Sequence, residues 1–268
     1  IVSIGNLTVG GSGKTPFVIS LASKYSSVYI ISRGYGRESK GLVEVSRDGQ
    51  ILCDVFQSGD EPMLIAKSLL NASVIVSEDR IKAIELAKSQ GAKIIFLDDG
   101  FNRVSIKKFE ILLFPSTIRN YLPFPAGPFR EFYFSKMFAD LNLVEDRDFK
   151  RVVNIKNPTP RMLLVTAISN PQRLEPFLPD GVIERVYLED HSYFDKIHIR
   201  DKFLKINATS LLVTQKDEVK IIDFDLPLSI MELSLTPIGQ DKSLVLDNYI
   251  KNYILDQVQQ HHHEDYYQ

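Results

Sequence analysis

Short apolar runs alternate with longer amphipathic segments along the first half of the chain. The runs are rich in Val and Ile and predict strands, and the segments between them have the spacing of helices. Strands are predicted at residues 1–4, 28–32, 73–76, 93–97, 110–114 and 141–144, with a hairpin over 42–54. Helices are predicted at 15–24, 60–70, 77–91 and 130–139, with Ser77 as the cap of the third. Strands separated by helices imply a mainly parallel sheet flanked by helices, so the predicted fold class is α/β.

A polar stretch with two prolines, residues 154–160, interrupts this alternation and predicts a linker. Beyond it, strands are predicted at 162–168, 182–188, 210–214 and 229–235, followed by a closing helix at 243–258. These elements predict a second, smaller α/β domain. The expected division is a core domain over 1–155, a C-terminal domain over 156–258 and a polar tail over 259–268.

The composition is that of an ordinary globular protein, since 44% of the 268 residues are hydrophobic, 25% are charged and the net charge is -2. The balanced charge argues against nucleic acid as a partner, because neutralising a phosphate backbone needs a basic excess. A single cysteine excludes a disulfide framework and fits a reducing compartment. No apolar run approaches the roughly 18 residues that cross a bilayer. Because Ile1 already lies in a predicted strand, we expect that a preceding segment, with any anchor, is missing.

The strongest chemical signal is a glycine-rich loop over residues 8–15, between the first strand and the first helix. Glycines let backbone N–H groups turn toward phosphate oxygens, and the helix N-terminus adds its dipole. Lys14 is expected to place its charge on the β- and γ-phosphates, and the Thr15 hydroxyl to hold Mg²⁺. The predicted fold is therefore P-loop NTPase-like, with a nucleoside triphosphate as ligand. The residues predicted to bind it are Gly10, Gly11, Ser12, Gly13, Lys14 and Thr15.

A P-loop needs a carboxylate on a neighbouring strand to complete the Mg²⁺ site. Asp98 and Asp99 follow the apolar run 94–97 directly and are the predicted metal ligands. The alternative is an ordinary turn, for which Asp-Gly is common. The sequence does not decide which of the two aspartates lies closer to the metal.

Four further residues allow two interpretations each. Asp60 precedes Glu-Pro at a helix start, which suits an N-cap as well as a catalytic carboxylate. Arg33 follows a strand and Arg80 lies in the first turn of a helix, where a cation is slightly unfavourable unless an anion binds nearby. His191, in the predicted second domain, is a structural or a catalytic histidine. Residues 214–217 resemble a guanine-specificity loop, but their adjacent Lys and Asp speak against a GTPase.

Several stretches occur together in one order over roughly residues 1–220: 3–16, 32–35, 59–62, 77–80, 97–101, 125–131, 190–191 and 213–217. This set resembles the lipid A 4′-kinase (tetraacyldisaccharide 4′-kinase) family of lipopolysaccharide synthesis. The family loop also lacks the first glycine of the usual P-loop pattern, as this chain does at Thr8.

The resemblance implies a kinase that uses ATP and Mg²⁺ to phosphorylate the 4′-hydroxyl of a tetraacyldisaccharide 1-phosphate. It implies that Asp60 acts as base toward this hydroxyl, aided by His191 once the domains close. Arg33 and Arg80 are implied to face phosphates, and residues 214–217 are expected to help frame the nucleotide. The acceptor contacts that it implies are Asn6, Tyr35 and Arg130.

The chain departs from the family at Asn102 and Arg103, where a Gln-His pair is usual, so the roles of these side chains stay open. Family members also carry an amphipathic or membrane-inserted helix before the first strand. We therefore expect the full-length protein at the cytoplasmic face of the bacterial inner membrane, and this fragment to be soluble. Two alternatives remain: another P-loop small-molecule kinase or ligase, which would not need Asp60 or His191, and a nucleotide-switch module without lipid kinase activity.

Overall fold

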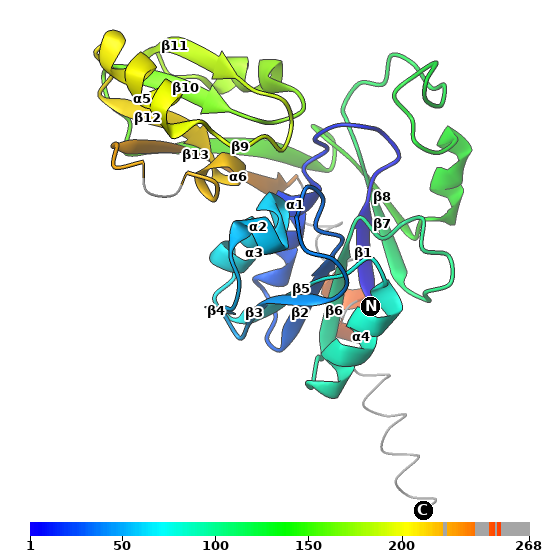
Figure 1. Ribbon diagram of the computed structural model, residues 1–268. Coiled ribbons are helices and arrows are strands. Elements are labelled where there is room, and N and C mark those ends of the chain that lie inside the picture. The colour runs from blue at the N-terminus through cyan, green and yellow to red at the C-terminus, as the bar shows by residue number, and fades with distance from the viewer. Residues whose placement is uncertain (222–223, 239–246, 250, 253–268) are drawn as a thin grey trace, which may run out of the picture.

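Two β-sheets, each with mainly parallel strands, divide the chain into two lobes (Figure 1). The structure is a computed structural model that describes residues 1–221, 224–238, 247–249 and 251–252. The first lobe contains the strands up to β8, and the second begins with β9. This arrangement confirms the predicted α/β fold class with a mainly parallel, helix-flanked sheet.

The first sheet has the strand order β4-β3-β5-β2-β6-β1-β7-β8. All neighbours run parallel except β3, which is antiparallel to both β4 and β5. The strands are β1 (Val2–Gly5), β2 (Val28–Ser32), β3 (Val43–Arg47), β4 (Gln50–Ile51), β5 (Ala72–Val76), β6 (Ile94–Asp98), β7 (Phe109–Phe114) and β8 (Leu141–Val144). They confirm the strands and the hairpin that the apolar runs predict.

Helices cover both faces of this sheet, because successive strand residues point to opposite sides. Ile30 packs in one cluster with side chains of α1 and α3, whereas Ile31 packs in another with side chains of α4. The helices of this lobe are α1 (Lys14–Ala22), α2 (Val55–Ser58), α3 (Asp60–Ser68) and α4 (Arg80–Ser89), with the 3-10 helix η1 (Tyr133–Phe138). The two faces together form the main core of the lobe.

Two local predictions in this lobe are wrong. The cap of α4 is Asp79, whose carboxylate accepts from two backbone N–H groups, while the Ser77 hydroxyl donates to the Asp79 carbonyl. The predicted helix 130–139 is only the 3-10 helix η1. A helix cannot begin at Arg130, because Phe129 forms a β-bridge with Thr8 and the Arg130 N–H donates to the Leu7 carbonyl.

The second sheet has the order β11-β10-β12-β13-β9, with only β9 antiparallel to its neighbour. Its strands are β9 (Phe149–Lys156), β10 (Met162–Thr166), β11 (Val182–Tyr187), β12 (Ser210–Thr214) and β13 (Leu228–Pro237). Its helices are the 3-10 helix η2 (Pro171–Phe177), α5 (Lys196–Lys205) and α6 (Gln215–Glu218). The predicted strands of this half are confirmed.

The predicted linker at 154–160 begins too early, because residues 154–156 belong to β9 and pair with β13. The change of sheet lies between β8 and β9, and only the prolines after Lys156 leave the ladder. Of the predicted closing helix 243–258, the structure describes 247–249 and 251–252, which are helical. The rest of that helix and the tail 259–268 lie outside the described residues.

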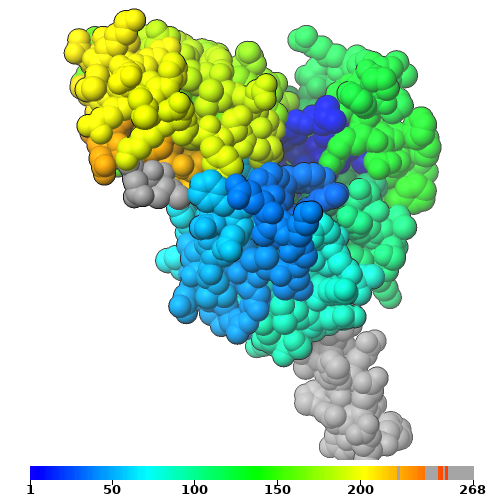
Figure 2. All heavy atoms as spheres, viewed as in Figure 1, coloured from blue at the N-terminus to red at the C-terminus, as the bar shows by residue number. Residues whose placement is uncertain are grey.

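The lobes share part of one core. The Phe17 ring of α1 lies 6.2 Å from the Phe149 ring of β9, and Leu235 of β13 joins the same cluster. This contact leaves the carboxyl ends of the first sheet's parallel strands open beneath the second lobe, where ligands bind in such sheets. Figure 2 shows the surface hollowed there, with N-terminal residues at the bottom between the two flanking parts.

Candidate active site

A cavity of about 700 Å³ lies between the lobes. From the first lobe it is lined by the P-loop 10–16 and by residues at or just after the ends of strands, namely Ser32, Arg33, Tyr35, Asp98 and Asp99. From the second lobe it is lined by 168–170, Arg173, Asp190, His191 and 214–216. The cavity therefore collects most of the residues that the sequence singles out.

The P-loop presents backbone rather than side chains to this cavity. Gly10 and Gly13 have φ of +93° and +83°, a region that other residues rarely adopt. A Cβ at Gly10 or Gly11 would meet nothing within 4 Å. Helix α1 starts at Lys14, and the N–H groups of its first turn have no partner within the helix. Loop and helix end together make a site for phosphate oxygens.

Lys14 is held by a buried amide. Its Nζ donates to Asn6 Oδ1 at 2.8 Å, and the same oxygen accepts from Arg130 Nη2 at 2.6 Å. The Asn6 Nδ2 donates to the Thr8 carbonyl at 2.6 Å. Asn6 is buried, and both ends of its amide are bonded within the protein, where its oxygen orients two cations. Its implied contact with the acceptor stays a prediction.

The two adjacent aspartates have different surroundings. Asp99 accepts from both Nη atoms of Arg130 at 2.8 Å and lies 3.7 Å from Lys14 Nζ. Hydrogen bonds from Arg130 and the charge of Lys14 outweigh the burial of Asp99 and hold its pKa below the usual value. Asp98 is different, since burial and the negative charge of Glu61 raise its pKa to about 7. Among the described residues, Asp98 Oδ1 has no hydrogen-bond partner.

These surroundings fit a divalent cation at Asp98. A buried carboxylate oxygen that has no partner among the described residues and lies close to a second negative charge is suited to Mg²⁺, and Thr15 of the P-loop lines the same cavity. The described residues contain no cluster of three or more His, Cys, Asp or Glu side chains that could hold a metal by themselves.

Asp60 lies at the first residue of α3, directly after Gly59. Gly59 has φ of +86°, and a Cβ there would approach the Tyr35 carbonyl to 2.8 Å, so only glycine fits. Both Asp60 carboxylate oxygens lie 3.0 Å from His191 Nδ1, and Oδ1 also accepts from the Glu61 N–H at 2.8 Å. The structure thus joins two residues that are 131 positions apart in the sequence.

His191 comes from the second lobe, in the loop after β11, where it has φ of +64°. Its N–H donates to the Ala167 carbonyl at 3.2 Å, which fixes the backbone, and its Nε2 lies 3.7 Å from Asp190. The hydrogen bond with Asp60 raises the pKa of His191 above the usual value of a histidine. The imidazole is therefore fixed by groups at both ring nitrogens.

Two lysines at α6, which the sequence did not single out for this role, complete the environment of Asp60. Lys216 Nζ lies 3.2 Å from Glu61, 3.4 Å from Asp190 and 3.7 Å from Asp60. Lys220 Nζ lies 3.6 Å from Asp60. Burial would raise the pKa of Asp60, but the His191 hydrogen bond and the charges of Lys216, His191 and Lys220 hold it below the usual value. The position of α6 directly after a strand was the available signal.

The two arginines predicted to face phosphates, Arg33 and Arg80, have different surroundings. Arg33 is exposed and lines the cavity, with its guanidinium 5.3 Å from the Tyr35 ring. Arg80 is buried, does not line the cavity and donates to the Ser77 carbonyl. Burial and the charge of Arg103 lower the pKa of Arg80 to about 10. The expectation that Arg80 faces phosphates stays a prediction; in this structure its side chain lies in the protein interior.

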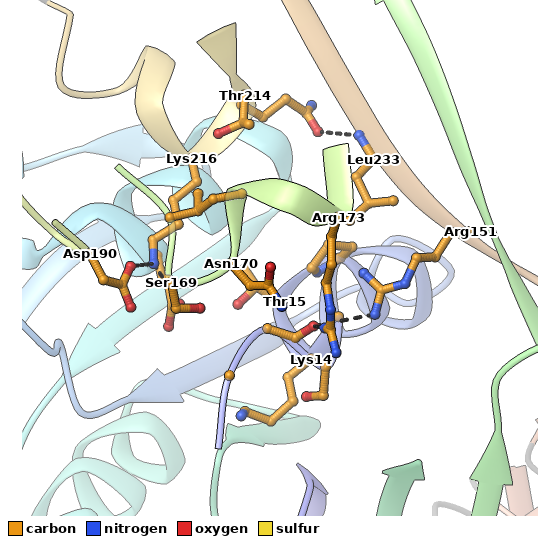
Figure 3. A pocket seen from close by; sticks show the side chains of 18 of the residues that line it. Lys14, Thr15, Arg151, Ser169, Asn170, Arg173, Asp190, Thr214, Lys216 and Leu233 are labelled. Carbon is orange, nitrogen blue, oxygen red and sulfur yellow. Dashed lines mark hydrogen bonds and ion pairs between the residues drawn. The ribbon is translucent and has the colours of Figure 1, made fainter. Parts of the chain in front are cut away.

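Two arginines of the second lobe reach the P-loop without having been predicted. Arg151 of β9 and Arg173 of η2 both donate to the Gly11 carbonyl, the first at 3.3 Å. Figure 3 shows them converging beside Lys14 and Thr15, while Lys216 points toward Asp190 on the other side of the cavity. The second lobe therefore adds positive charge at the phosphate site.

Comparison with known proteins shows the family of this chain. Residues 1–254 match the sequence model of a family described as tetraacyldisaccharide-1-P 4′-kinase. The tetraacyldisaccharide 4′-kinase of Helicobacter acinonychis is 50% identical over 255 residues, which are 94% of this chain and 81% of that protein. The one of Aliarcobacter butzleri is 49% identical over 243 residues, 88% of this chain and 77% of that protein.

A solved structure shares the fold as well. The crystal structure of LpxK from Aquifex aeolicus in complex with ATP has a TM-score of 0.74 and 27% sequence identity, covering 93% of this chain and 87% of that one. The P-loop, the partner-free Asp98 oxygen and the Asp60–His191 pair thus occur in a chain that matches one kinase family over nearly its whole length. This chain belongs to the tetraacyldisaccharide 4′-kinase family.

Proposed function

We propose that this chain transfers the γ-phosphate of ATP to the 4′-hydroxyl of a tetraacyldisaccharide 1-phosphate, a step of lipid A biosynthesis. The observation that carries the proposal is the Asp60–His191 pair: His191 lines the same cavity as Lys14 of the P-loop, and its Nδ1 holds the Asp60 carboxylate at 3.0 Å. A nucleotide switch has no need of a buried carboxylate–histidine pair beside its phosphate site.

The nucleotide is proposed to lie on the P-loop residues 10–15, with Lys14 and Arg33 directed at its phosphates. Thr15 and Asp98 would hold Mg²⁺, which when bound neutralises charge on the β- and γ-phosphate oxygens. Asp99 is occupied by Arg130, so we assign it to orienting that arginine rather than to the metal. Arg130 and Tyr35 remain the proposed contacts of the acceptor.

In the reaction, the 4′-oxygen forms a bond to the γ-phosphorus while the bond from that phosphorus to the β,γ-bridging oxygen breaks. ADP leaves, and the hydroxyl proton passes to an Asp60 carboxylate oxygen. Because phosphoryl transfer has a loose transition state, the main task of Asp60 is to orient the hydroxyl and to accept its proton late. His191 fixes the carboxylate from the second lobe, so the pair is complete only when the lobes are close.

We also propose that the enzyme works at the cytoplasmic face of the inner membrane, since ATP is cytoplasmic and the acceptor's acyl chains are held in a bilayer. Among the described residues, no helix is both long and apolar enough to cross a membrane. Large apolar side chains instead gather on one exposed segment, which suits contact with lipid. They are Tyr121, Leu122, Phe124, Phe132, Phe134, Met137 and Phe138.

The test of the proposed function is an assay of ADP release by the full chain, with the acceptor presented in phospholipid vesicles. We expect turnover that requires the acceptor and yields a 4′-phosphorylated product by mass spectrometry. Sedimentation of the protein with acceptor-free vesicles checks the membrane part. ATP binding without acceptor-dependent turnover would instead support a nucleotide switch, and turnover on soluble hydroxyl compounds alone would support another small-molecule kinase.

The two aspartates give a matched test of the metal site. Asp98→Asn is expected to raise the Mg²⁺ concentration for half-maximal rate about tenfold or more, because it removes the charge of the partner-free carboxylate. Asp99→Asn is the control, since its carboxylate is bonded to Arg130. A titration of rate against Mg²⁺ checks this, and an equal or larger shift for Asp99→Asn would contradict the assignment.

A further inference from the structure

The turn after α6 places a buried ammonium group between the lobes. The Lys220 side chain is 1% exposed, and its Nζ lies 3.6 Å from Asp60 Oδ2 and 3.2 Å from Asp217 Oδ1. It also donates to the Ser192 carbonyl at 3.2 Å. One cation thus connects the proposed base on the first lobe to a carboxylate on the second.

Asp217 anchors this cation from the second lobe. It is fully buried and accepts from Thr166 Oγ1 at 2.6 Å, Thr214 Oγ1 at 2.7 Å and the Ala167 N–H at 3.1 Å. The Ala167 carbonyl in turn accepts from the His191 N–H at 3.2 Å. The segment that presents Lys220 to Asp60 therefore also holds the backbone that carries His191.

Lys220 differs from its neighbour Lys216 in what it can touch. Lys216 lines the cavity and lies among Asp60, Glu61 and Asp190, so it is within reach of a ligand. Lys220 does not line the cavity, and its Nζ lies 3.6 Å from Asp60 Oδ2. Lys220 therefore influences the reaction only through the groups that it contacts, and of these Asp60 is the one proposed to act on the acceptor.

We propose that Lys220 is a positioning residue for phosphoryl transfer: it holds the Asp60 carboxylate ionised and turned toward His191 when the two lobes are together. This inference rests on the proposed function. The groups around Asp60 that carry or can carry charge are Glu61 on its own helix, His191 and Tyr193 after β11, and Lys216 and Lys220 at α6. Of these, Lys220 is buried away from the cavity and bonded to both lobes.

The first test is kinetic. Lys220→Met is expected to lower kcat about 30- to 100-fold while the KM values for ATP and acceptor stay within about threefold, because the variant disturbs the base and not the binding groups. Lys220→Arg keeps the charge and is expected to recover at least about a third of the wild-type kcat. Lys220→Gln, which keeps a donor without the charge, serves if the methionine variant does not fold, and it should resemble Lys220→Met in its kinetics.

Lys108→Met is a matched control, because Lys108 is another buried lysine in an ion pair. Its side chain is 4% exposed, its Nζ lies 2.5 Å from Glu110, and it does not line the cavity. The kcat of Lys108→Met, corrected for the folded fraction of the variant, should stay within about twofold of the wild-type kcat. An equal loss in Lys108→Met and Lys220→Met would reduce Lys220 to a structural role and overturn the proposal.

A double-mutant cycle decides whether Lys220 acts through Asp60. In an Asp60→Asn background, Lys220→Met should lower the residual kcat by less than about twofold, because the group it acts on is already gone. A further 30-fold loss in that background would overturn the proposal. Absence of acceptor phosphorylation by the wild-type chain would be a failure of the proposed function instead, and is therefore distinguishable from a failure at Lys220.

Discussion

Replacing Lys14 by methionine is expected to lower kcat about 10³-fold, which corresponds to about 4 kcal/mol of lost transition-state stabilisation. The ammonium is held at the phosphate site by Asn6 Oδ1 at 2.8 Å and lies 3.7 Å from Asp99. Charge that develops on the transferred phosphoryl group needs a cation already in place, and methionine offers none. Steady-state kinetics with saturating ATP and acceptor measures the loss.

Lys24→Met is the matched control for this variant. Lys24 follows the same helix, its side chain is 42% exposed, and it pairs with Asp247 at 3.4 Å, far from the phosphate loop. An exposed pair of this kind contributes about 1 kcal/mol or less to stability, so kcat should stay within about twofold of wild type. A Lys14→Met enzyme with more than a tenth of the wild-type kcat would contradict the role assigned to Lys14.

The second large effect is expected for Asp60→Asn, whose kcat should fall about 10²- to 10⁴-fold. Asparagine keeps the size of the side chain but can neither accept the hydroxyl proton nor hold the charge that His191, Lys216 and Lys220 face. The residual rate comes from phosphate binding alone. Because Asp60→Asn removes the negative charge that faces Lys216 and Lys220, the variant can be less stable. Its folded fraction is therefore measured together with kcat.

Two pH effects accompany this substitution. Because the hydrogen bond with Asp60 raises the pKa of His191, that pKa should fall back toward about 6.5 in Asp60→Asn, which an NMR titration of the imidazole measures. The pKa of Asp60 is lowered by folding, so its ionisation stabilises the fold above the unfolded pKa of about 3.9 and this stabilisation is lost as the pH falls. The free energy of unfolding of Asp60→Asn, measured by denaturant titration at several pH values, should therefore lack the part of the loss at low pH that protonation of Asp60 causes in the wild type.

Asp79→Asn is the matched control for Asp60→Asn, because Asp79 is also an aspartate at a helix start but has no proposed role in catalysis. Asp79 caps α4 by accepting from the Ile81 and Lys82 N–H groups, and asparagine caps nearly as well. Its kcat is expected to remain within about twofold of wild type. If Asp60→Asn kept wild-type kcat, the carboxylate would have only the helix-start role that the sequence alone also allowed.

The phosphate site could be predicted from the sequence because its parts are local. Glycines between a strand and a helix that starts with a lysine and a threonine set the loop backbone by themselves, and Asp98 ends the adjacent strand. The choice between Asp98 and Asp99 was not predictable. It depends on Arg130, which reaches Asp99 from 31 positions away and leaves the Asp98 oxygen without a partner.

The predictions that failed depend on partners distant in sequence. The helix expected from Arg130 is blocked by a β-bridge to Thr8, and the linker expected at 154–160 begins inside a strand that pairs with β13. In each case a local preference was overridden by a hydrogen bond or a pairing that the local pattern does not contain.

The sequence by itself determined a P-loop α/β protein with a nucleotide site, and through its motifs the family. Only the tertiary structure decided which charged groups surround the proposed base, Asp60. Asp60 and His191 meet across 131 positions, and Lys216 of α6 and Lys220 of the turn after it come to them from the other lobe. The physical reason is that backbone conformation is set largely by neighbours in the chain, whereas the pKa of a buried carboxylate is set by burial and by whichever charges the fold brings within a few ångströms.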